Sequence, residues 1–250
     1  MAILTQFVFR LSFGLALGMA LVSPRLVTSG YYRNHLYVLL GLGVLATMSA
    51  LARGGGAAMA PPLAMAILSY AGSVLWLYEK PRAGLVALLL VSATALWGAW
   101  QSTDWLGTSD GAIAFLQALN PVSGGLVLGW TMAAMFLGHW YLNSPGMAIA
   151  SLARLVVLLG AAIVLRAVVE AADLAICLRA GQLATQQWLF LALRWLAGIF
   201  GALALVAMTY KTLKIPNTQS ATGILYVCVI ATFLGELVAM LSAVEFPRGP

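Results

Sequence analysis

Three charged side chains follow one another along a single apolar stretch of the sequence. Within residues 154–173, Arg166, Glu170 and Asp173 are spaced by four and three residues, so a helix would place all three on one face. The stretch is long and apolar enough to cross a bilayer. Charges at membrane depth cost several kcal/mol unless they are paired or wetted, and they face protein or a cavity. The sequence therefore predicts a polar feature inside a membrane-embedded bundle.

Three other apolar stretches also carry a single charge, namely Arg10, Arg194 and Glu236. With a helical rise of about 1.5 Å per residue, Arg10 and Arg166 lie about 10 Å below one membrane face, Arg194 roughly 16 Å and Glu236 roughly 10–14 Å. Two interpretations remain open. The charges form a paired network that fixes helix packing, or they form a working site, either a proton relay or a cavity that binds an anion or a quinone.

A second polar layer is predicted at the opposite membrane face, around the two histidines. Its members are His35 and His139 with Tyr32, Arg33, Trp140, Tyr141 and Arg154. A histidine pair at one depth would suit the axial ligands of a b-type haem or the carbonyl of a quinone. Haem is less favoured than quinone, because neither histidine lies deep in its span. The alternative is that each side chain only anchors its helix at the lipid headgroups.

The composition indicates an all-α, polytopic membrane protein. Hydrophobic residues make up 62% of the 250 residues and charged residues 8%, against roughly 25% charged residues in soluble domains. The net charge of +6 comes from basic residues scattered singly along the chain, which argues against nucleic acid as a partner. The motifs of nucleotide-binding loops, zinc sites and acyl-transfer triads are absent from the sequence.

Apolar runs separated by turn signals predict eight membrane-spanning helices in a single transmembrane domain, residues 1–250. They cover about residues 3–22, 35–52, 58–78, 83–100, 121–141, 148–177, 183–210 and 221–244. Asn120-Pro121 is a helix-start signal, so the fifth helix is expected to begin there, after the long connection 101–120.

Basic residues are distributed unequally between the two sets of connections. The connections after the first, third, fifth and seventh helices hold Arg25, Arg33, Lys80, Arg82, Lys211 and Lys214, whereas the other side holds Arg53, Arg179 and Arg248. The positive-inside rule places the first set in the cytoplasm. We therefore expect a protein of the inner (cytoplasmic) membrane with both termini outside.

Eight helices with charges at mid-membrane depth form an architecture similar to the quinone-interacting integral subunits of respiratory oxidoreductases that lack bound haem. This resemblance implies an integral subunit of a membrane redox complex, which binds quinol at one polar layer, helps to move protons through the charged layer and associates with extrinsic subunits that hold metal centres. Two alternatives remain: a small-anion transporter or channel that uses Arg10, Arg166 and Arg194, or a non-catalytic scaffold subunit.

Overall fold

The computed structural model describes residues 2–103, 111–144, 146–180, 184–215 and 217–245, and within these ranges it is helical without strands. The described helices are α1 (Ala2–Leu21), α2 (Ser29–Leu51), the short 3₁₀ helix η1 (Gly56–Met59), α3 (Ala60–Leu77), α4 (Pro81–Gln101), α5 (Gly111–Asn143), α6 (Ala150–Ala180), α7 (Thr185–Leu193), the π-helical segment η2 (Arg194–Gly201), α8 (Ala202–Lys214) and α9 (Thr218–Glu245). Since α7, η2 and α8 follow one another directly, the described residues contain eight stretches that are long and apolar enough to cross a membrane. The predicted fold class is confirmed.

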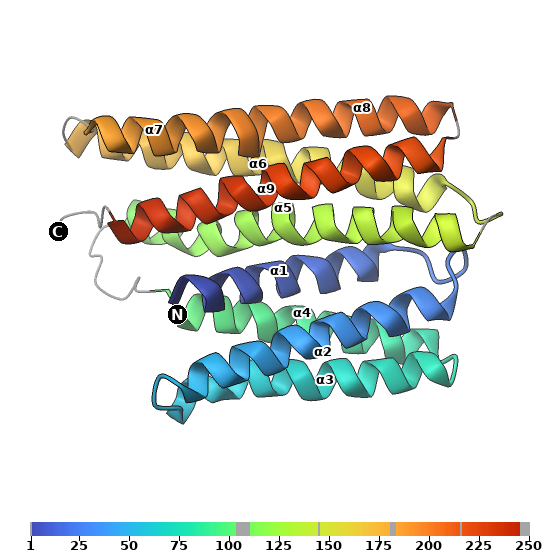
Figure 1. The fold of residues 1–250 in the computed structure, drawn as a ribbon. Helices are drawn as coiled ribbons and strands as arrows, with labels where there is room; N and C mark the ends of the chain where they lie inside the picture. The colour runs from blue at the N-terminus through green and yellow to red at the C-terminus, as the bar shows by residue number, and fades with distance from the viewer. Residues whose placement is uncertain (1, 104–110, 145, 181–183, 216, 246–250) are drawn as a thin grey trace.

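The helices lie side by side in two groups (Figure 1). In the first group α2 packs on α3, and α4 packs on both α1 and α3; in the second, α5 packs on α6 and α9, and α8 packs on α9. The main contact between the groups is made by α1 and α5. The beginning of α1 and the end of α9 lie at the same end of the bundle.

Glycines bring α1 and α5 into direct backbone contact. A Cβ atom on Gly14 would lie 1.9 Å from the carbonyl oxygen of Gly125, and one on Gly129 would lie 2.0 Å from the carbonyl carbon of Gly14. Small residues at such a crossing allow two membrane helices to approach closely. The contact holds the N-terminal half of α1, including Arg10, against the second group.

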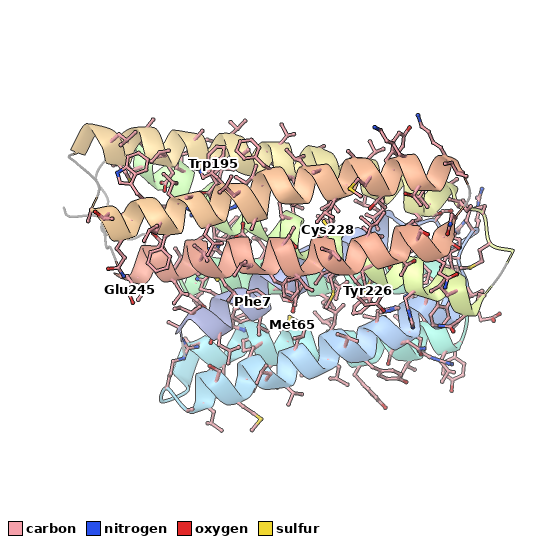
Figure 2. All side chains as sticks on the ribbon, turned by 45° about the horizontal axis from the view of Figure 1, so that its top comes forward. Phe7, Met65, Trp195, Tyr226, Cys228 and Glu245 are labelled. Atoms are coloured by element: carbon pink, nitrogen blue, oxygen red, sulfur yellow. The ribbon has the colours of Figure 1, made fainter. Side chains whose placement is uncertain are left out.

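Large apolar side chains cover the outside of the bundle (Figure 2). Ile67 on α3, Leu196 on η2 and Ile230 on α9 are each more than half exposed. Water would disfavour so much exposed apolar surface, whereas lipid tails accept it. The surface therefore agrees with a chain that lies in a lipid membrane.

The second helix begins at Ser29 and not near His35, so Tyr31 and Tyr32 belong to its first turns. Both rings are fully buried. The ring of Tyr32 stacks on Trp76 at a centroid distance of 3.9 Å, and its hydroxyl donates to the carbonyl of Val22 at 2.9 Å. This packing explains why α2 includes a segment that its glycine and polar residues had predicted to be a connection between helices.

The fifth helix passes through Pro121 and begins at Gly111. A proline inside a helix removes the hydrogen bond from its own nitrogen to the carbonyl four residues earlier, here that of Gln117. The preceding residue, Asn120, has polar partners of its own, because its side-chain and backbone oxygens accept hydrogen bonds from Arg166. Contacts with α6 thus stabilise this part of α5 despite the proline, and the local helix-start signal does not mark the start.

Candidate functional site

The guanidinium of Arg166 lies at the centre of a buried group of charges. Its Nε donates to Glu236 Oε1 at 2.6 Å and its Nη2 donates to Glu236 Oε2 at 2.9 Å. The same Nη2 lies 2.8 Å from Glu170 Oε1, one helical turn away on α6. Its Nη1 donates to Asn120 Oδ1 at 3.0 Å and to Ser123 Oγ at 3.2 Å. Every nitrogen of this side chain, which is only 2% exposed, therefore contacts an oxygen of the protein.

Two further arginines join these carboxylates from other helices. Arg194, at the start of η2, forms an ion pair with Glu170. Arg10 on α1 lies 3.7 Å from Glu236 Oε2 through its Nη1, and the same nitrogen donates to Asn120 Oδ1 at 3.1 Å. We refer to Arg10, Arg166, Glu170, Arg194 and Glu236 as the charge cluster.

The charge cluster connects α1, α6, η2 and α9, with polar support from α5. Each charged side chain in it is at least 85% buried. Charges buried to this degree are tolerated when they are paired and hydrogen-bonded. Three guanidinium groups face two carboxylates, so the cluster carries one positive charge more than negative when all five groups are ionised.

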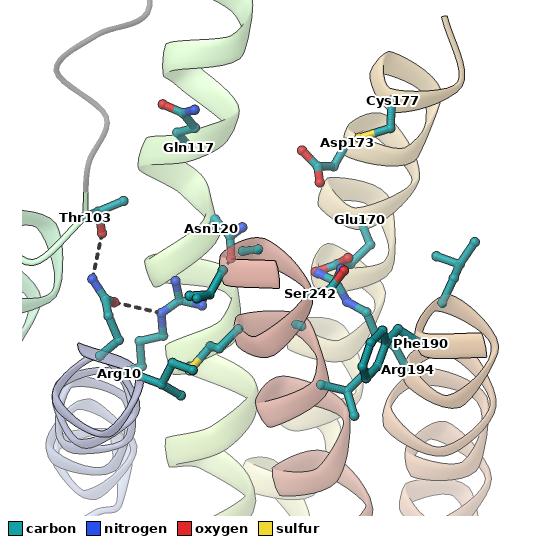
Figure 3. A pocket seen from close by; sticks show the side chains of 18 of the residues that line it. Arg10, Thr103, Gln117, Asn120, Glu170, Asp173, Cys177, Phe190, Arg194 and Ser242 are labelled. Atoms are coloured by element: carbon teal, nitrogen blue, oxygen red, sulfur yellow. Dashed lines mark hydrogen bonds and ion pairs between the residues drawn. The ribbon is translucent and has the colours of Figure 1, made fainter. Parts of the chain in front are cut away.

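A cavity of about 490 Å³ extends from the ends of the helices to the charge cluster (Figure 3). We call it the large cavity. Ala2 at the beginning of α1 and Val244 near the end of α9 line it, and so do Arg10, Glu170 and Arg194 of the cluster. The cavity therefore joins one end of the bundle to buried ionic groups.

Polar and apolar side chains both line the large cavity. The polar ones include Gln6, Thr103, Gln117, Asn120, Asp173, Gln187 and Ser242, and the apolar ones include Ile3, Leu174, Phe190, Leu191, Val238 and Met240. Asp173, predicted to share a helix face with Arg166 and Glu170, is half-buried and lies one turn closer to the end of the bundle than Glu170. Such a lining suits an amphipathic ligand with a polar group directed toward the cluster.

The two histidines lie near the opposite end of the bundle and make separate contacts. The ring of His35 is buried against Tyr31 and Phe136, at centroid distances of 4.6 and 4.4 Å. The ring of His139 is exposed, and its Nδ1 lies 3.3 Å from the hydroxyl of Tyr226 on α9. The two rings thus pack against different helices, which does not favour the axial haem ligation considered from the sequence.

The other residues predicted for the histidine layer have individual structural contacts. Trp140 donates from Nε1 to Thr28 Oγ1 at 2.9 Å, and Tyr141 donates from its hydroxyl to the carbonyl of Ala148. Arg33 is half-buried and Arg154 is exposed. The large cavity is lined neither by these side chains nor by the stacked Tyr32.

Sequence reasoning did not identify the neutral partners of the charges. Asn120 was interpreted only as a helix-start residue, yet its Oδ1 accepts hydrogen bonds from both Arg10 and Arg166. Gln6 likewise accepts a hydrogen bond from Arg10 Nε at 3.3 Å and donates to Thr103 Oγ1 at 2.8 Å. Gln6 lies four residues before Arg10, and that spacing is the one sequence signal that would have indicated this contact.

No protein-family model, curated protein or solved structure matches this chain.

Proposed function

We propose that this protein is an integral subunit of a membrane redox complex that binds quinol in the large cavity and transfers protons from it to the charge cluster. The observation that supports this proposal is a cavity of about 490 Å³ that ends on a buried glutamate between two arginines, Glu170 between Arg166 and Arg194. Glutamates beside arginines at membrane depth are typical of proton pathways.

The lining of the large cavity suits a quinol headgroup. Its volume lies within the roughly 300–1,000 Å³ of small-molecule sites. Phe190 and Met240 offer apolar surface for the ring. Glu170 can accept a hydrogen bond from a quinol hydroxyl, and Arg10 can donate to a quinone carbonyl. The sequence left a quinone possible at either polar layer, and we now favour the charged end because the cavity and the ionisable groups coincide there.

Oxidation of a quinol releases two electrons and two protons. Glu170 accepts a proton from the hydroxyl that it contacts, while the electrons pass to an acceptor such as an iron–sulfur cluster on a partner subunit. The second proton leaves through the polar lining of the large cavity. By the positive-inside rule the cavity opens outside the inner membrane, where both termini lie. The proton that leaves through the large cavity is therefore released on the outer side, whereas the other passes to the charge cluster through Glu170.

A binding titration with a fluorescent quinol analogue, a hydroxyquinoline N-oxide, tests this proposal. Glu170→Gln replaces the charged acceptor, and hydrogen bonds to charged groups contribute about 1.5–3 kcal/mol. We therefore expect the analogue to bind about tenfold more weakly or worse. His139→Gln, an exposed position in the histidine layer, is the matched control and should leave binding unchanged. Wild-type affinity in Glu170→Gln, or loss of binding only in His139→Gln, would contradict the proposal.

A small-anion transporter is the second candidate, because the charge cluster has three guanidinium groups for two carboxylates. Arg10 and Arg194 both line the large cavity, where they would attract an anion. Proteoliposomes loaded with a halide-sensitive dye separate the two functions. Halide influx that is lost in Arg10→Gln supports transport, whereas quinol-analogue binding without influx supports the redox subunit.

A further inference from the structure

A second, much smaller cavity lies against the charge cluster, between α6, η2 and α9. Its volume is about 10 Å³, close to the minimum of roughly 10–15 Å³ that holds one water molecule. Four members of the charge cluster line it together with Gly198, Ile199, Thr232 and Gly235. The site is therefore the size of a single water molecule, and its lining includes four charged side chains and the hydroxyl-bearing Thr232.

Two facing glycines explain why side chains do not fill this space. Gly198 on η2 and Gly235 on α9 meet backbone to backbone, since a Cβ atom on Gly235 would lie 2.5 Å from Gly198 Cα. Gly198 lies in the π-helical segment that begins at Arg194, and π-helical turns inside α-helices often occur at functional sites. The segment directs the guanidinium of Arg194 and the bare backbone of Gly198 toward the same small cavity.

The two carboxylates of the charge cluster lie close enough to each other for one water to bridge them. Glu170 Oε1 lies 2.8 Å from Arg166 Nη2, and Glu236 Oε2 lies 2.9 Å from the same atom. The two oxygens are thus separated by no more than two hydrogen-bond lengths. A water molecule at hydrogen-bond distance from each would span such a gap.

One of these oxygens also lacks a hydrogen bond. Among the described residues, Glu170 Oε1 is buried and contacts two guanidinium groups, but it accepts no hydrogen bond of good geometry. The two guanidinium groups compensate its charge, and an ordered water can supply the hydrogen bond that they do not make. Thr232 Oγ1, which donates to the carbonyl of Cys228 at 3.0 Å, keeps lone pairs for a water hydrogen.

We propose that the small cavity is a binding site for one water molecule that links Glu170 to Glu236. The role of this water in proton transfer rests on the proposed function; its presence does not. When Glu170 carries a proton taken from the large cavity, it gives that proton to the water, and the water gives one of its own to Glu236. Glu170 returns to a carboxylate, Glu236 becomes a carboxylic acid and the water is unchanged.

A high-resolution cryo-EM or crystal map of the intact chain tests the site directly. We expect a density peak within hydrogen-bond distance of Glu170, Glu236 and Thr232 Oγ1. A map that resolves these side chains without a peak between them overturns the proposal. Because the wild-type protein is used, the result does not depend on whether a variant folds.

Deuterium exchange followed by infrared spectroscopy tests the role of the water. After transfer into D₂O, the carboxyl band of protonated Glu236, identified by its loss in Glu236→Gln, should shift severalfold more slowly in Thr232→Val than in wild type. Thr222→Val is the matched control, because Thr222 is another buried threonine on α9 and donates only to the carbonyl of Thr218 among the described contacts. Equal deuterium-exchange rates in wild type, Thr232→Val and Thr222→Val overturn the relay.

The two proposals fail in different ways. If no protonated Glu236 band is found at any pH at which the protein stays folded, the proton function of the charge cluster is wrong, and the map still decides whether the water is bound. If the band is present but Thr232→Val exchanges as fast as wild type, the charge cluster takes up protons without this water.

Discussion

Arg166 on α6 binds both carboxylate oxygens of Glu236 on α9, with Nε at 2.6 Å from Oε1 and Nη2 at 2.9 Å from Oε2. The two-point geometry restricts how the two side chains can be oriented, because the planar guanidinium must align with the carboxylate. The remaining nitrogen, Nη1, binds α5 through Asn120. One side chain therefore joins three helices of the second group and compensates two buried carboxylates.

Replacing Arg166 with methionine should destabilise the protein strongly. The apolar side chain leaves Glu170 and Glu236 buried without their shared cation, and breaking a buried pair in this way costs about 3–5 kcal/mol. Arg166→Lys should lose less stability than Arg166→Met, because lysine retains the positive charge. It should still be less stable than wild type, because lysine does not reproduce the two-point geometry. Unfolding free energies measured by steric trapping in bicelles would show both effects. Arg53→Met, at an exposed arginine, should change stability by less than about 0.5 kcal/mol.

Adding one methyl group at the contact between η2 and α9 should also destabilise the bundle. In Gly235→Ala the new Cβ would lie 2.5 Å from Gly198 Cα, so the helices must separate, and overpacking of this kind costs about 1–3 kcal/mol. Gly223→Ala is the matched control on the same helix, since nothing lies within 4 Å of its Cβ position. That change should be neutral or stabilising by up to about 1 kcal/mol. Equal stability of the two variants would show that the close contact does not form.

The sequence allowed the helical membrane fold to be predicted because apolar runs long enough to span a bilayer admit few other structures. It also indicated that Arg10, Arg194 and Glu236 lie at similar depth, because helical rise converts sequence position into height. Depth does not specify which face of a helix points toward a neighbour. For that reason His35 and His139 shared a predicted layer, although their rings pack against different helices.

Features that depend on contacts between distant segments could not be predicted. The early start of α2 follows from the stacking of Tyr32 on Trp76, and Asn120-Pro121 suggested a helix start that contacts with other helices override. The π-helical segment at Arg194 has no sequence signature of its own. The large cavity is likewise a property of the assembled helices, since its lining comes from the ends of several of them.

Cys177 should report on the large cavity without any engineered residue. It lines the cavity and is half-buried, whereas Cys228 is fully buried in the core. A small thiol reagent should therefore label Cys177 and leave Cys228 unmodified in the folded protein, as mass spectrometry of peptides would show. If quinol occupies the cavity, the quinol analogue should slow labelling of Cys177 severalfold. Labelling that is insensitive to a saturating analogue would place its binding site elsewhere.

The orientation of the chain can be tested with single cysteines at the two ends of the bundle. Ala57 in η1 is exposed at the end that holds the charge cluster, and Asn143 is exposed at the end of α5 near the histidines. In a Cys177→Ser background, an impermeant maleimide should label Ala57→Cys in intact cells and Asn143→Cys only after lysis, because most basic connection residues lie at the Asn143 end. The reverse labelling pattern would mean that the large cavity opens toward the cytoplasm. Protons released from the cavity would then enter the cell, and the proposed direction of proton release would be wrong.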